Sequence, residues 1–446
     1  MQYNIDKYCI VEVYKMDLKI AIKDILRENK GIRLKNLKKR NFNINILLNK
    51  KADKINTFTG FRRVGKTYLL FLIMEYLKKD ATCIYFNFED ERLPESTEVL
   101  TQLIYAVEEL YSDRPGILFL DEIHVIPGWG KFLRRIMDQG YRVFVTGSSS
   151  KLGLKEIPTE LRGRTRSYSI FPLSFKEYLT FKDVPFDNID SHRKAEINRI
   201  LDEYLVYGGF PEIYDADDLE RKEVIQEYFR TLVQRDLIER FNIKEETLLR
   251  ATIKLVLNSL TISISKLTKT LKSIGFRCSK NTISNYLSHM ENSFFLYQAL
   301  FFSNNVKDQM QYPRKVYFID NGFLKYLSLN PDKSRSLENL VAVELKRRGY
   351  DLYYWKNLKG EEVDFVIVED ETVKRLIQVC YNMTFEDTRE REVKALKKGM
   401  QHFDLDRGII LTLNQEETII ENDFKITLIP VSKWLLDGLE DEDFGY

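Results

Sequence analysis

The sequence predicts an α/β protein with a parallel sheet near its amino terminus, a helical middle and a second α/β region at its end. Before residue 150, short and almost continuously apolar runs alternate with helical patterns. From Asp190 to Tyr297 the pattern is mostly helical, and from Pro313 strands and helices alternate again. Continuous apolar runs are typical of strands that helices cover on both faces. The alternation therefore favours a doubly wound fold in the first region.

The first region begins with a helical pattern and a basic connector, which precede its strands. Residues Met16 to Asn29 have apolar side chains at helical spacing. A basic connector follows, because the stretch from Gly31 to Lys54 has eight Lys or Arg residues and one acid. We interpret this connector as a solvated face, with contact to a polyanion as the alternative. The expected strands are 54–60, 82–88, 116–121 and 141–146, and the expected helix is 66–79.

The later regions are less regular. Residues 263–298 read as a helix, a break at Gly275, a second helix and an aromatic strand, which is typical of a winged helix. Strands are expected near 316–320, 350–357, 362–368, 374–382 and 407–414, and helices at 337–349 and 388–399. We therefore expect three domains: 1–188, 189–312 with a helical lid and winged helix, and 313–446.

Composition limits the classes of function. The chain has 446 residues, with 69 Lys and Arg against 67 Asp and Glu, so any nucleic-acid site has to come from local clustering. Four scattered cysteines make no C-x-x-C pair, which favours a cytoplasmic protein without a zinc site. No run approaches 18 apolar residues, so no membrane span is expected.

One motif carries clear chemistry. The stretch 60–67, GFRRVGKT, matches G-x-x-x-x-G-K-[ST] between a predicted strand and a predicted helix. Its glycines let backbone N–H groups turn toward a phosphate at the helix N-terminus. Lys66 would neutralise the β- and γ-phosphates of ATP, and Thr67 would offer its hydroxyl to Mg²⁺. The nucleotide-binding residues expected here are Gly60, Phe61, Arg62, Arg63, Val64, Gly65, Lys66, Thr67 and Tyr68.

Two acids strengthen this prediction. Asp121 and Glu122 end the apolar run ILFLDE, and ligands of open α/β sheets bind at such strand ends. Asp121 would hold Mg²⁺, and Glu122 would orient and deprotonate the attacking water.

Three further residues are candidates for catalysis. Thr146 ends the fourth strand and would position the water as a sensor, or serve as a cap for the segment after Ser148. Arg162 and Arg164 would stabilise charge in the transition state, either within the chain or from a neighbouring subunit. Surface arginines are common, so an ordinary solvated role stays the alternative.

Together these stretches resemble a known family. TGFRRVGKT, LFLDEIH, FVTGSSS and GRTRSYSIFPLSFKEYL look like archaeal and bacterial AAA-type P-loop ATPases that carry a carboxy-terminal domain of unknown function. YLVYGGFPEIY, YFIDNGF, LENLVAVELKRRG and EEVDFVIV resemble that carboxy-terminal part. The resemblance implies an ATPase module, a helical or winged-helix middle and a restriction-endonuclease-like end, with oligomers as one mode of action.

The nuclease-like end departs from the pattern of active members. These place an acid on a helix, an Asp at a strand end and acid-x-Lys on the next strand. Glu344 (or Glu338) and Asp364 fit the first two positions, but the third reads Gln378-Val379-Cys380. We therefore expect a nuclease fold that has lost its catalytic set, with vestigial metal binding left open.

The region from Ser263 to Met290 has five Lys or Arg residues and no acid, which makes DNA a candidate partner. Its alternative role is an adaptor between domains. The main hypothesis is thus Mg-dependent ATP hydrolysis that moves the carboxy-terminal domains. The alternatives are a nucleotide-dependent DNA-binding or regulatory switch with little turnover, and an active metal-dependent nuclease.

Overall fold

The computed structural model forms two compact units, Met1–Ile170 and Phe171–Tyr446, and each is described by itself. The described residues are 2–30, 38–48, 54–78, 81–111, 116–148, 161, 163–187, 190–421 and 423–438, with side chains from residue 16 onward. The predicted boundaries at 188 and 312 stay a prediction, and both expected carboxy-terminal domains lie within the second unit.

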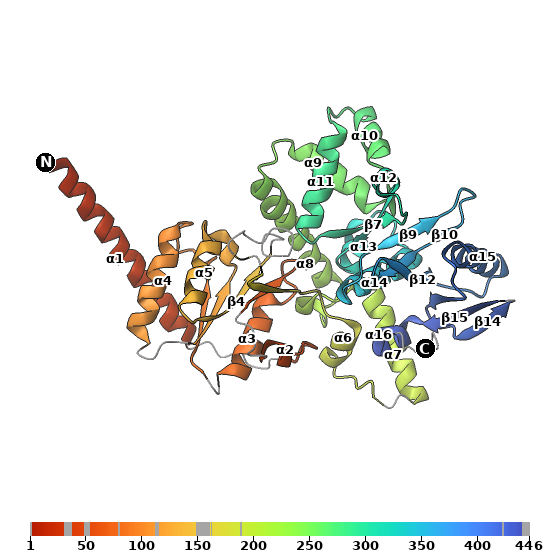
Figure 1. Ribbon diagram of the computed structural model, residues 1–446, viewed down its shortest axis with the longest axis horizontal. Coiled ribbons are helices and arrows are strands. Elements are labelled where there is room, and N and C mark those ends of the chain that lie inside the picture. Colours follow the sequence, from red (N-terminus) through yellow and green to blue (C-terminus); the bar gives the residue numbers. More distant parts are fainter. Residues whose placement is uncertain are drawn as a thin grey trace. The chain divides into compact units, whose positions relative to one another are not determined.

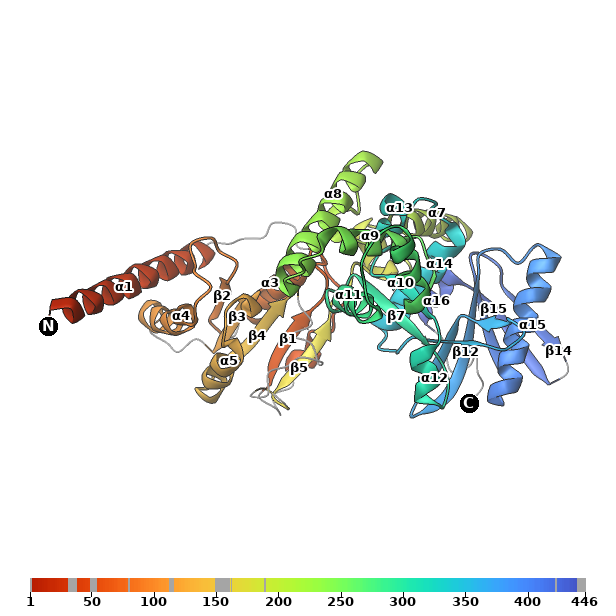
Figure 2. The same cartoon turned by 90° about the horizontal axis from the view of Figure 1, so that it is seen from above.

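The first unit is built on a five-stranded parallel sheet in the order β2-β3-β4-β1-β5, which Figure 2 shows side by side. Its strands are β1 Ile55–Thr59, β2 Cys83–Asn87, β3 Ile117–Asp121, β4 Arg142–Gly147 and β5 Thr165–Ser169. Every residue of β1 and β3 is buried, as the continuous apolar runs predict. This is the predicted α/β fold, although the sequence did not indicate β5.

The helices of the first unit cover this sheet. They are α1 Gln2–Lys30, α2 Asn45–Leu48, α3 Lys66–Leu77, α4 Thr97–Leu110, the 3₁₀ turn η1 Ile123–Val125 and α5 Trp129–Asp138. The predicted apolar face of α1 is confirmed, because Leu18, Ile22, Ile25 and Leu26 are all buried in the core with α4. Ser96 caps α4 by accepting a hydrogen bond from the Glu98 N–H.

The second unit begins with helices and contains two further sheets (Figure 1). Its helices are α6 Phe175–Phe181, α7 Ser191–Tyr207, the turn η4 Pro211–Ile213, α8 Asp218–Thr231, the π-helix η5 Leu232–Glu239, α9 Glu246–Leu257, α10 Ile264–Ser273, α11 Lys280–Asn292, α12 Val306–Gln311, α13 Asn321–Leu327, α14 Lys333–Arg347, α15 Glu386–Phe403 and α16 Val431–Asp437. Its strands are β6 Thr261–Ile262, β7 Leu296–Phe301, β8 Arg314–Phe318, β9 Tyr353–Lys356, β10 Glu362–Val363, β11 Phe365–Glu369, β12 Thr372–Cys380, β13 Arg407–Thr412, β14 Glu417–Glu421 and β15 Phe424–Pro430.

The last sheet, in the order β11-β12-β13-β15-β14, has a helical layer on each face. Successive side chains of a strand point to opposite faces, so Phe365 packs in the core with α14 and α16. Its neighbour Val366 packs in the other core, with Leu396 and Met400 of α15. This alternation of side chains fixes which face of β11 meets each of the two cores.

The middle sheet, in the order β10-β9-β7-β8-β6, carries α9, α10 and α11. The hairpin strands β7 and β8 are antiparallel, and β6 pairs antiparallel with β8. The element order is therefore a helix, a short strand, two helices and a hairpin, with α12 in the hairpin connection.

Two segments that lie far apart in the sequence, the turn after α7 and the turn before α13, are in contact. The carboxylate of Asp320 accepts hydrogen bonds from the N–H groups of Gly209, at 2.7 Å, and Gly322, at 2.8 Å. A Cβ atom at Gly208, where φ is +80°, would lie 1.7 Å from an Asp320 oxygen. The glycine pair after α7 is thus required for the close approach of the turn that begins α13.

Candidate nucleotide site

The loop between β1 and α3 has the backbone shape that the motif predicts. Gly65 caps α3 with φ at +92°, and Arg63 also has a positive φ, of 64°. A Cβ atom at Gly60 would lie 2.1 Å from the carbonyl oxygen of Ile170, so only glycine fits there. Left-handed residues between others turn successive N–H groups to one side and form an anion-binding hollow.

Lys66 lies inside this loop rather than in solvent, because its exposed fraction is 5%. Its Nζ donates to the carbonyl oxygens of Phe61, at 3.1 Å, and Gly60, at 3.3 Å. The same atom lies 3.5 Å from Oε1 of Glu122. The ammonium thus lies against the backbone of the loop that the motif assigns to phosphate.

Asp121, at the end of β3, gathers three hydroxyl groups. Its Oδ2 accepts from Thr67 at 2.7 Å and from Tyr85 at 2.8 Å, and its Oδ1 accepts from Thr146. Burial raises the pKa of Asp121, and the charge of Glu122 raises it further, while the three hydroxyl contacts oppose this shift. Tyr85 belongs to no local motif, so the sequence did not indicate its contact with Asp121.

The strand order explains the reach of Thr146. Because β4 lies between β3 and β1, its carboxyl end stands between Asp121 and the phosphate loop. The Thr146 hydroxyl also accepts the N–H of Glu122, at 3.0 Å. Among the described residues, Thr146 thus contacts both acids. The segment 149–160, which Thr146 would cap in the alternative role, lies outside the described residues.

Glu122 is buried and has a strained backbone, with φ at +52°. Its Oε2 accepts the N–H of Ser148 at 2.9 Å and lies 3.2 Å from Nδ1 of His124. Burial acts to raise the pKa of Glu122, but the charge of Lys66 and the contact with His124 bring it well below the usual range. The carboxylate is therefore ionised at neutral pH.

The arginines of the motif and its surroundings have separate places. Arg62 pairs with Glu89 at 3.3 Å, and Arg40, from the basic connector, donates to the carbonyl oxygen of Val64 at 2.8 Å. Part of that connector thus supports the loop, a role that the sequence did not indicate.

Of the two candidate arginine fingers, only Arg164 is among the described residues, and it does not lie at the loop. Arg164 pairs with Asp138 at 2.9 Å, and its carbonyl oxygen accepts the N–H of Ile55 at the start of β1. This is the opposite end of β1 from the phosphate loop, so a role for Arg164 depends on a neighbouring subunit. Arg162 lies outside the described residues.

A second charged cluster lies in the other unit. Nζ of the buried Lys315, on β8, lies 2.7 Å from Asp364, 3.0 Å from Glu338 and 2.8 Å from Glu362. Asp364 also accepts the N–H of Val379 at 2.9 Å. The cation that the third motif position lacks is thus present, but it comes from a different strand.

The expected vestigial site is otherwise rearranged. Glu344 is not part of this cluster, because it pairs with Arg347 and Arg348 at 2.9 and 2.8 Å. Its alternative Glu338 is the helix acid that meets Asp364 through Lys315. Gln378 accepts the N–H of Asp364 at 3.2 Å and donates to Glu392 at 2.6 Å.

Comparison with known proteins places the chain among relatives of the same length. It is 39% identical to an uncharacterized protein of Methanocaldococcus jannaschii, over 97% of this chain and 99% of that one. It is 30% identical to an uncharacterized protein of Haemophilus influenzae, over 87% of this chain and 95% of that one. The chain belongs to this family. In this chain an AAA-type P-loop ATPase region is followed by domains of unknown function.

Three family descriptions match successive stretches of the chain. Residues 52–179 match an AAA domain, residues 198–334 match the domain of unknown function DUF8612, and residues 333–434 match DUF4143. The first match contains the phosphate loop, both acids and Thr146. The fold of this region therefore supports nucleotide binding.

Solved structures give weaker likenesses. The Walker-type ATPase Paby2304 of Pyrococcus abyssi covers 64% of this chain and 93% of its own, at 13% identity and a TM-score of 0.43. AMPPCP-bound DnaA of Aquifex aeolicus covers 56% and 85%, at 14% identity and a TM-score of 0.27. At these TM-scores neither structure bears on the function of this chain.

The residues of the loop fit ATP and Mg²⁺. Thr67 and Asp121 offer adjacent oxygen ligands, and Mg²⁺ typically takes one or two such ligands together with phosphate oxygens and water. In the described part of the chain no group of three His, Cys, Asp or Glu residues could hold a metal by itself. In that same part no helix has the length and apolar character of a membrane span.

Proposed function

We propose that the chain binds ATP with Mg²⁺ and hydrolyses it, and that this cycle rearranges the carboxy-terminal unit. The observation that carries the proposal is the contact set among Lys66, Glu122, Asp121, Thr67 and Thr146. These residues come from two adjacent strand ends and one helix N-terminus, where the sheet edge and the helix dipole favour an anion.

Each residue has a separate role in the proposal. The loop N–H groups and Lys66 bind the phosphates, while Thr67 and Asp121 would hold Mg²⁺, which neutralises charge on the transferred phosphoryl group. Glu122, ionised and fixed by the Ser148 N–H, accepts a proton from the attacking water. Thr146 holds Asp121 and Glu122 in position through its hydroxyl group.

Glu122→Gln tests this assignment. The variant retains the shape of the side chain but is no base, so we expect ATP binding near that of the wild type and at least a roughly hundredfold fall in phosphate release. Glu75→Gln is the matched control, because Glu75 is an exposed acid on α3 that pairs with Lys78. Fluorescent-nucleotide titration and a phosphate assay measure the two quantities.

The outcomes separate the hypotheses. Turnover that is unchanged in Glu122→Gln contradicts its role as the base. Tight ATP binding with no turnover, even in the wild type, favours the nucleotide-dependent switch instead.

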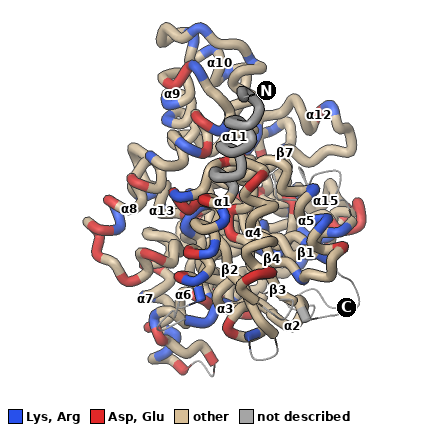
Figure 3. The backbone as a smooth tube through the Cα atoms, turned by 90° about the vertical axis from the view of Figure 1, so that its left-hand side faces the viewer, with Lys and Arg blue, Asp and Glu red and all other residues tan. Residues whose placement is uncertain are grey.

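We also propose that the helices α10 and α11 contact DNA. The order α9, β6, α10, α11, β7 and β8 supports a winged helix, and the stretch from Ser263 to Met290 has no acid. Figure 3 shows basic positions along α10, which carries Lys266, Lys269 and Lys272. Such clustering favours a polyanion partner despite the small net charge of the chain.

A further inference from the structure

A cavity of about 450 Å³ opens between the starts of α10 and α11 and the chain that leads from α12 into β8. Its polar lining comes from Ser263, Ser265, Lys280, Asn281, Ser284, Gln311 and Arg314. Neither Asp nor Glu is among the described residues that line it. A cavity with two cations and several neutral donors, but no carboxylate, suits an anionic ligand.

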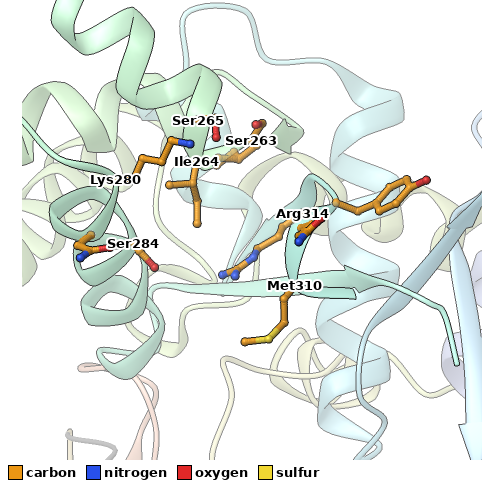
Figure 4. Close-up of a pocket in the computed structure, with 11 residues that line it drawn as sticks. Ser263, Ile264, Ser265, Lys280, Ser284, Met310 and Arg314 are labelled. Carbon is orange, nitrogen blue, oxygen red and sulfur yellow. The ribbon is translucent and has the colours of Figure 1, made fainter. Parts of the chain in front are cut away.

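The two cations approach the cavity from different elements. Figure 4 shows the Lys280 amine extending from α11 toward the start of α10, and the Arg314 guanidinium extending from β8 toward α11. Arg314 donates from Nη1 to Oε1 of Gln298 at 2.8 Å, and Gln298 donates to Glu291 at 2.9 Å. The guanidinium is thus held in place by one of its five N–H groups.

Backbone polarity adds to this charge. Ile264 and Ser265 are the first residues of α10, and Lys280 and Asn281 are the first residues of α11. The N–H groups of a first helical turn lack partners within the helix. Two helix starts at one basic cavity therefore reinforce its preference for an anion.

The apolar side of the cavity indicates more than a bare anion. Ile264, Met310 and Tyr312 also line it, and Met310 is 67% exposed. The Tyr312 ring stacks on Phe301 with centroids 4.1 Å apart, which holds the half-exposed ring in place. Contacts to the phosphates and sugars of DNA come from Arg, Lys, Ser, Asn, Gln and Tyr side chains, and this cavity combines all of these types.

We propose that this cavity binds a backbone phosphate of DNA through Lys280 and Arg314, with Tyr312 against the adjoining sugar. The inference rests on the DNA contact proposed above and assigns it to particular residues. The lysines of α10 continue the positive surface beyond the cavity, which favours a polyanion over a single small phosphate ester.

The test measures binding of a fluorescein-labelled DNA duplex to the full chain at several salt concentrations. We expect Lys280→Gln and Arg314→Gln each to weaken binding roughly tenfold at low salt and to lower the salt slope by about one. Lys280→Arg should retain the wild-type affinity, since it keeps the charge. Lys398→Gln is the matched control, because Lys398 is an exposed lysine of α15 whose ammonium donates to Oε1 of Gln401.

Two results would overturn the proposal in distinguishable ways. If the wild-type chain binds the duplex and Lys280→Gln binds it equally well with the same salt slope, the cavity is not the site and the DNA contact lies elsewhere. If the wild-type chain binds no duplex at any salt concentration, both the contact and the cavity assignment fail. ATP turnover, measured separately, is untouched by either result.

Discussion

Lys315 is a buried lysine whose ammonium meets three carboxylates. Burial alone would lower the pKa of Lys315, but Asp364, Glu338 and Glu362 raise it well above the usual range. Glu338 and Asp364 stand at the helix and strand-end positions where active members of the nuclease family that this region resembles hold a metal ion, whereas Glu362 lies outside that pattern. The Lys315 ammonium lies between Glu338 and Asp364, where a metal ion would have to bind, and this position favours the prediction that the region lacks nuclease activity.

This prediction has two measurements. Wild-type protein with Mg²⁺ or Mn²⁺ should leave plasmid DNA intact, and cleavage that is lost in Asp364→Ala would show that the site is active. Lys315→Met leaves Glu338 and Asp364 buried without their cation, so we expect a loss of about 3–5 kcal/mol in the free energy of unfolding, measured by urea titration. Lys356→Met removes only a half-exposed partner of Glu362. We therefore expect it to lower the free energy of unfolding, measured in the same way, by less than about 1 kcal/mol.

At the scale of elements, the turn after α7 depends on its glycines. Gly208→Ala adds a Cβ atom 1.7 Å from Asp320 and strains a backbone with φ at +80°, so we expect a loss of roughly 3 kcal/mol or more. Gly275→Ala is the control, because φ there is +98° but nothing lies within 4 Å of the added atom. Its loss should be about 1 kcal/mol, and equal losses in urea unfolding would contradict a role for the contact.

The same contact predicts a pH dependence. Burial raises the pKa of Asp320 to about 7, against the opposing effect of the N–H groups of Gly209 and Gly322. A raised pKa means that the folded state binds the proton more tightly than the unfolded state. The stability that Asp320 contributes is therefore complete below its ordinary pKa of 3.8 and is lost as the pH rises through about 7. Asp320→Asn should reduce the change in the free energy of unfolding with pH over this range.

Elements and sites differed in how far the sequence could predict them. The phosphate loop and the two acids were predictable because each is a local motif beside a continuous apolar strand. β5, with the polar sequence TRSYS, has no buried residue that would mark it as a strand. β14 is also largely exposed, and the sequence did not indicate its hairpin with β15.

The remaining misses are contacts between distant residues. Lys315 stands 49 residues from Asp364, and Gly209 stands 111 residues from Asp320. No spacing rule relates such pairs, because only the tertiary fold brings them together. For the same reason Tyr85, on β2, could not be assigned to Asp121 on β3 before the sheet was known.

At the scale of the molecule, the two units have separate cores. Trp129, Leu120 and Val145 belong to the core of the first unit, whereas Trp434 and Phe365 belong to one in the second. We therefore expect calorimetry of the whole chain to show two unfolding transitions. A nonhydrolysable ATP analogue with Mg²⁺ should raise only one of them, since the phosphate loop lies in the first unit.

The size of the shift follows from linkage. At about a hundred times its Kd, a ligand that binds only the folded state adds about 2.7 kcal/mol of stability. Lys66→Ala should abolish this shift, whereas Gly208→Ala should lower the transition that the nucleotide leaves unchanged. If the nucleotide moves both transitions together, the units unfold as one, and the ATP site is then coupled to the sheets that carry the proposed DNA contact.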